Sequence, residues 1–189
     1  MADTIRTLTD LVTNLFKDGQ PSLAITPQDM RDLLFSVQMQ YAMMTYAPGS
    51  LTLTLNTWDK IDLVTTLQTA NGFSNSADGD LNYDAPPINS ITGANDTKPV
   101  IVMGFCSFEP ATAGDVFEFT IGKDNTASTL YSHIKKSAAT ATDDNSITFM
   151  GIDTAVASGQ DLQLFVKNVT ATRNITINAL HMFALALTV

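Results

Sequence analysis

The last seventeen residues, 173–189, constrain the fold more than any other stretch of the chain. Residues 173–179 (RNITINA) alternate polar and apolar side chains, which is the period of a strand with one wet face and one buried face. Residues 180–189 (LHMFALALTV) are apolar on both faces apart from His181 and Thr188. A strand of this kind needs cover on both sides, whereas the second sheet of a sandwich covers only one.

In a chain of this size, another copy of the chain is the simplest second cover for this strand. A central strand buried wholly within one subunit is the alternative. We therefore expect one face of the segment to lie in the core and the other to form a subunit interface. The predicted interface residues are His181, Phe183, Leu185 and Leu187.

Composition and charge restrict the class of protein. The 189 residues are 44% hydrophobic, which is typical of a folded domain. A net charge of −9 provides no basic surface for binding nucleic acid. The single cysteine, Cys106, lies in the apolar run 100–108 and is expected to be a buried free thiol. We find neither a signal peptide nor a stretch long enough to span a membrane, and therefore expect a protein made in the cytoplasm without membrane contact.

Residues 1–47 differ in kind from the rest and are expected to form a helical hairpin. Apolar residues at spacings of three and four predict one helix before the turn at 18–22. Thr26 and Pro27 then begin a second helix, whose apolar stripe continues through Tyr41 and Met44. Two short helices cannot form a stable domain alone, so we expect this module to pack on the β-domain, on sister chains or on a larger assembly. The six residues expected to anchor it are Leu8, Leu11, Phe16, Ile25, Met30 and Leu34.

From residue 48 onward the period changes to two, and turn residues recur about every ten positions. Many antiparallel strands without intervening helices predict a mainly β fold, a jelly-roll β-sandwich over 48–189.

The order of several motifs resembles the tumour necrosis factor-like jelly-roll domain of phage and bacterial fibre proteins. The motifs are NTWDKI, GDLNYD, VIVMGFCSF, VFEFTIGKDN, ITFMGIDTAVASGQDLQLFVKN and NITINALHMFAL. The segment with Ile25, Thr26, Pro27, Asp29 and Arg31 resembles the short helical segment that precedes fibre and appendage domains in tailed-phage virion proteins. The resemblance implies a homotrimer with its helical end toward the virion and its jelly roll outward. The chain lacks the long repetitive shaft of a full tail fibre, and this favours a capsid decoration or head-fibre protein.

Candidate chemistry is sparse. His133 and His181 lie in predicted strands without a nearby nucleophile motif, so structural roles are expected and no enzyme is predicted. Asp78, Asp80 and Asp84 share the alternate spacing of a calcium loop, but the glycine is misplaced and no glutamate closes the site. We therefore expect no metal and no cofactor, with these three aspartates as weak candidates.

Three functional classes follow from these observations. A structural virion protein on the capsid surface, bound to the major capsid protein or another virion protein, accounts for the anchor, the jelly roll and the sparse chemistry together. A receptor- or glycan-binding tail-fibre or tail-tip protein on the same fold is the alternative, although Trp58, the only tryptophan, is expected in a strand. A jelly-roll enzyme is disfavoured because the sequence has no cluster of two histidines and a carboxylate.

Overall fold

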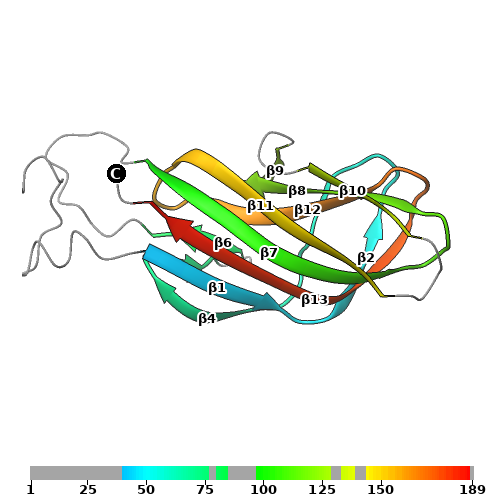
Figure 1. Cartoon of the computed structure of the whole chain (residues 1–189), viewed down its shortest axis with the longest axis horizontal. Coiled ribbons are helices and arrows are strands. Elements are labelled where there is room, and N and C mark those ends of the chain that lie inside the picture. Colours follow the sequence, from blue (N-terminus) through cyan, green and yellow to red (C-terminus); the bar gives the residue numbers. More distant parts are fainter. Residues whose placement is uncertain (1–39, 77–79, 85–96, 129–132, 139–143, 188–189) are drawn as a thin grey trace, which may run out of the picture.

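The computed structural model describes residues 40–76, 80–84, 97–128, 133–138 and 144–187. These residues form two antiparallel sheets packed face to face (Figure 1). Sheet A contains β1 (Gln40–Tyr46), β2 (Gly49–Leu53), β4 (Thr65–Asn71), β7 (Lys98–Pro110), β11 (Asn145–Val156) and β13 (Arg173–Ala186). Sheet B contains β3 (Asp59–Lys60), β5 (Phe73–Asn75), β6 (Leu81–Tyr83), β8 (Val116–Lys123), β9 (Thr126–Ala127), β10 (His133–Ser137) and β12 (Asp161–Asn168).

The strand order is that of a jelly roll. The chain passes from β7 in sheet A to β8 in sheet B, and β13 and β12 return beside them, β13 next to β7 and β12 next to β8. On the other side of the same pair, β11 lies next to β7 and β10 next to β8. Two antiparallel ribbons are thus wound around each other, which confirms the predicted jelly-roll sandwich.

The core lies between the sheets and is built from the inward positions of each strand. Its largest fully buried side chains include Phe108, Phe117 and Phe119. The centroid of the Phe119 ring lies 5.1 Å from that of Phe108, and the two rings are tilted. The centroid of the Phe117 ring lies 5.4 Å from that of Phe108, and these rings meet edge to face. Both arrangements are favourable for aromatic pairs. Cys106 belongs to this core and is a buried free thiol, as expected.

The prediction that the second helix continues to residue 47 is wrong for its last part, because Gln40–Tyr46 forms the strand β1. This strand pairs with β13 on one side and β4 on the other. Its sequence, QYAMMTY, is apolar on both faces, so the three-residue spacing of Tyr41 and Met44 was compatible with either period. Hydrogen bonding to β13 and β4 stabilises the strand rather than the helix. Residues 1–39, with all six predicted anchor residues, lie outside the described residues.

Candidate functional site

Two rows of apolar side chains cross the outer face of sheet A. These outer apolar rows follow the strand register from β11 through β7 and β13 to β1. One row is Ile152, Ile101, Leu185 and Tyr41, and the other is Met150, Met103, Phe183 and Met43. Met150 is 63% exposed and Ile152 48%, although both are large apolar side chains. An exposed apolar patch of this extent on a charged domain marks an interaction surface.

The structure places the predicted interface residues on this same face. Along β13, Leu180, Met182, Ala184 and Ala186 point into the core and are buried. The alternate positions point outward: His181 is exposed, whereas Phe183, Leu185 and the following Leu187 are partly exposed. The strand therefore has two apolar faces, only one of which is covered within the described part of the chain.

The opposite end of the outer face is polar. Ser50 and Thr176 approach to 2.9 Å through their hydroxyl groups, and Thr52 donates to Asn174 Oδ1 at 2.9 Å. Between the two ends, the register of β13 against β7 shifts between Ile177 and Ala179. The outer face of sheet A thus changes from apolar to polar along its strands.

The bulge at this shift directs one amide toward two carboxylates. Asn178 Nδ2 donates to Glu109 Oε1 at 3.0 Å and to Asp144 Oδ1 at 2.5 Å. These contacts join β13 to β7 and to the residue that precedes β11. The side chains mark where the apolar rows end.

The apolar end of this face is also the end at which the described chain begins and finishes. Gln40 pairs with Ala186, and the amide of Leu187 donates to the Pro99 carbonyl at 2.8 Å. In Figure 1 the start of β1 and the arrowhead of β13 lie side by side at the left. Residues 1–39 therefore join the sandwich directly beside the outer apolar rows.

Sequence reasoning missed six members of the outer apolar rows. The sequence predicts a helix at Tyr41 and Met43, and it predicts strands without an interface role at Ile101, Met103, Met150 and Ile152. A signal was present for β7, because its run 100–108 is apolar on both faces, as in residues 180–189. Two such strands side by side predict one continuous exposed surface.

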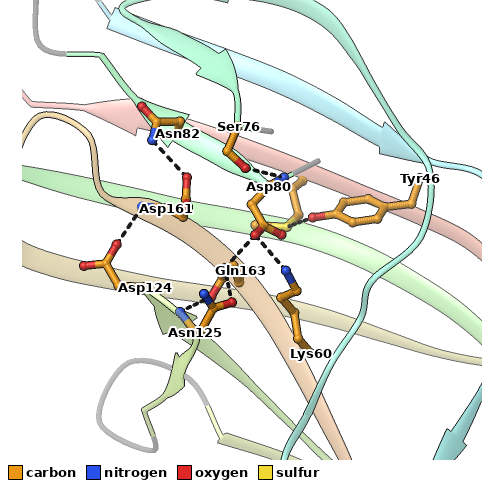
Figure 2. A network of polar contacts seen from close by, with 10 residues as sticks. Tyr46, Lys60, Ser76, Asp80, Asn82, Asp124, Asn125, Asp161 and Gln163 are labelled. Carbon is orange, nitrogen blue, oxygen red and sulfur yellow. Dashed lines mark hydrogen bonds and ion pairs between the residues drawn. The ribbon is translucent and has the colours of Figure 1, made fainter. Parts of the chain in front are cut away.

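A buried polar network surrounds Asp80, the residue that precedes β6 in sheet B (Figure 2). Asp80 is buried and its Oδ2 accepts hydrogen bonds from Lys60 Nζ at 2.9 Å and Gln163 Nε2 at 2.7 Å. The Oε1 of Gln163 accepts from the backbone N–H of Asn125 at 2.7 Å. The network thereby ties the turn after β8 to β12 and to the start of β6.

The three weak metal candidates are not brought together in the described structure. Asp80 is engaged as above, and Asp84 is exposed after β6. Asp78 lies outside the described residues. Within the ranges that the structure describes, no group of three His, Cys, Asp or Glu side chains could hold a metal ion.

A second group of acids lies beside this network. Asp161 accepts from Asn82 Nδ2 at 2.9 Å, and Asp124 accepts from the backbone N–H of Asp161 at 2.9 Å. Burial raises the pKa of Asp161, and repulsion from Asp80 and Asp124 adds to this, whereas the Asn82 hydrogen bond opposes it. Carboxylate repulsion is therefore built into this corner of the fold.

The remaining reactive side chains are poorly placed for catalysis. Burial raises the pKa of the Cys106 thiol to about 12, so that it is not a nucleophile at neutral pH. His181 pairs across the sheet with Phe105 and Thr45, neither of which is a carboxylate that could orient an imidazole. His133 is the first residue of β10. The described strands therefore present a surface for binding more clearly than a reaction centre.

A membrane-crossing helix is not found among the residues that the structure describes.

No family model matches the sequence, and no curated relative matches it. Solved structures similar to the chain include the PRD1 vertex protein P5, with a TM-score of 0.45 and 14% identity over 78% of this chain and 72% of that one. Murine APRIL at pH 5.0 gives a TM-score of 0.46 and 11% identity over 79% of this chain and 100% of that one. Eiger TNF from S. frugiperda gives 0.43 and 8%, over 78% and 93%. The strand order itself establishes the chain as an antiparallel jelly-roll sandwich.

Proposed function

We propose that this protein is a homotrimeric structural component of a tailed-phage virion, a capsid decoration or head-fibre protein that binds the assembled shell. The outer apolar rows carry the proposal. They expose large side chains from four strands, including Met150 at 63% and Ile152 at 48%, on a chain whose net charge is −9. Such a face is a liability unless another surface covers it.

A second and third copy of the chain fit this surface as covers. The rows lie on one sheet face, and the strand at its edge, β11, contributes Met150 and Ile152 from its exposed positions. Around a three-fold axis, such an edge can pack on the face of the neighbouring copy and close a ring. The predicted interface residues His181, Phe183, Leu185 and Leu187 lie on that face.

The N-terminal module supplies the contact with the shell in this proposal. Because residues 1–39 join at the apolar end of sheet A, a trimer would bring its three modules together at one end. Three copies add avidity when neighbouring shell sites match their spacing. Leu8, Leu11, Phe16, Ile25, Met30 and Leu34 remain the proposed anchor residues, with a major capsid protein or another virion protein as partner.

Electron microscopy of virions with and without the protein tests this function. We expect density at capsid surface sites that disappears when the gene is deleted. Since the protein would bind the assembled shell and not its loose subunits, deleted particles should form but release DNA at a lower temperature. Heads of normal heat resistance, together with lost adsorption to the host, would instead identify a receptor- or glycan-binding tail protein.

A further inference from the structure

Three methionines from three different strands lie in a single row of the outer face of sheet A. Met150 of β11 pairs with Met103 of β7, Met103 pairs with Phe183 of β13, and Phe183 pairs with Met43 of β1. Met150 is 63% exposed and Met43 39%, and Met103 is partly exposed. Three of the four side chains in this row of the outer apolar rows are therefore thioethers.

The chain offers matched methionines on the opposite face of the same sheet. Met44 follows Met43 in β1 but points into the core, and Met182 precedes Phe183 in β13 and does likewise. Both are 0% exposed. Exposure to solvent therefore separates the outer methionines from two core methionines of the same sheet, one of which, Met44, directly follows Met43 in β1.

We propose that Met43, Met103 and Met150 form a sulfoxidation site that controls self-association, an inference that rests on the proposed trimer. The oxidant is a peroxide. Its O–O bond breaks as a new S–O bond forms on the thioether, and the second peroxide oxygen leaves as water. The sulfur loses two electrons, the peroxide gains them, and one oxygen atom is added to the side chain.

Oxidation changes what this face can bind. A thioether is apolar and adapts to an imperfectly complementary surface, whereas a sulfoxide is polar and hydrogen-bonds to water. In a trimer the three rows would contribute nine such sulfurs, so a modification at each would place many polar groups in an apolar contact. The free protomer remains open to oxidation, and association competes with it by covering the row.

The test treats the full-length native protein with hydrogen peroxide over several protein concentrations, followed by size separation and peptide mass measurement. We expect Met43 and Met150 to gain oxygen at least about tenfold faster than Met44 and Met182, and more slowly at higher protein concentration. Peptides from the monomer fraction should carry the oxygen at Met43, Met103 and Met150. Equal oxidation of these residues in the trimer and monomer fractions would overturn the inference.

A variant of similar side-chain volume provides the control. M43L/M103L/M150L keeps an apolar row without oxidisable sulfur there, and it retains every other methionine and Cys106. It should remain trimeric after a peroxide treatment that dissociates the unmodified chain. Dissociation of this variant by the same treatment would overturn the inference. An untreated wild-type monomer would overturn the trimer proposal and this inference together, whereas an untreated trimer that resists peroxide would overturn this inference alone.

Discussion

Lys123 Nζ lies 2.7 Å from Asp153 Oδ2 and joins sheet B to sheet A across the edge of the core. The lysine also donates to the Ala155 carbonyl at 3.1 Å, while Asp153 Oδ1 accepts the Ala155 amide at 2.9 Å. At the other end of the sandwich, Arg173 of β13 lies 2.9 Å from the buried Asp115, which immediately precedes β8. Ion pairs thus connect the two layers at both ends of the sandwich.

Replacing Lys123 with alanine should remove the ion pair that it makes with Asp153, whose side chain is 6% exposed. We expect a loss of about 2 to 4 kcal/mol in the free energy of unfolding, because removing one member of a buried ion pair is costly. Urea unfolding measures this loss. The double variant K123A/D153A should recover part of it, and a K123A loss no larger than that of K136A, a variant of the edge strand β10, would contradict the assignment.

Leu185→Asp should separate association from folding. Leu185 points out of the sandwich, so the domain should keep its β-rich circular dichroism spectrum, while carboxylates in an apolar contact should prevent trimer formation. Light scattering should show a monomer. Thr176→Asp lies on the polar end of the same strand and should remain trimeric; loss of the trimer in both variants would place the contact elsewhere.

The start of a truncated chain should decide whether it folds. A chain beginning at Gln40 keeps β1 and should fold and trimerise, whereas a chain beginning at Ser50 loses it. That loss uncovers β13 and removes Ala42, Met44 and Tyr46 from the core. Each large side chain contributes about 1.5 to 3 kcal/mol on burial, a substantial part of the stability of a small domain. Thermal unfolding of both chains tests this; equal stability would contradict the role of β1.

Cys106 should resist alkylation until the sandwich opens. The side chain is 0% exposed and its pKa is raised to about 12, so little thiolate exists at pH 8. We expect iodoacetamide to label the native protein at least about 100-fold more slowly than the urea-unfolded chain. The rate in native conditions should follow the opening of the core, and rapid labelling without denaturant would show that this part of the core is accessible.

Asp161→Asn should stabilise the protein at neutral pH. Because the pKa of Asp161 is raised in the folded state, ionisation of its carboxyl group opposes folding. The contribution of Asp161 to the free energy of unfolding therefore increases as the pH falls through that pKa. The amide keeps an acceptor for Asn82 and removes repulsion from Asp80 and Asp124. The gain in melting temperature should be present at pH 7, decrease as the pH falls through the raised pKa of folded Asp161, and vanish below the pKa of this carboxyl in the unfolded chain. The exposed Asp84→Asn variant should show a smaller change; an equal one would contradict the local cause.

Much of the sandwich could be predicted because its strands carry period-two patterns and are separated by turn residues. β8 and β12 are typical, since each alternates core residues with side chains on the outer side of sheet B. The two apolar faces of β13 were visible for the same reason. The register between neighbouring strands determines which side chains form a row across the sheet, as in the outer apolar rows. This register depends on pairing between segments far apart in the chain, so it could not be predicted.

The incorrect prediction for β1 and the missed network around Asp80 also arise from contacts between segments far apart in the chain. β1 is too short and too evenly apolar to reveal its period, and it becomes a strand because β13 and β4 lie on either side. The network around Asp80 was equally hidden, since Lys60, Asn125 and Gln163 meet there from three separate segments. Spacing within one loop suggested a calcium site, whereas contacts from distant strands supply the partners of Asp80.

The turn between β7 and β8 lies at the end of the sandwich opposite the chain ends, beside Arg173. Within it, Gly114 has a φ of +82° and no heavy atom within 4 Å of the position that a Cβ would take. A foreign peptide inserted at this turn would extend from the far end of the domain, leaving the outer apolar rows untouched. On a virion that carries many copies, the same geometry would make this protein a scaffold for multivalent peptide display.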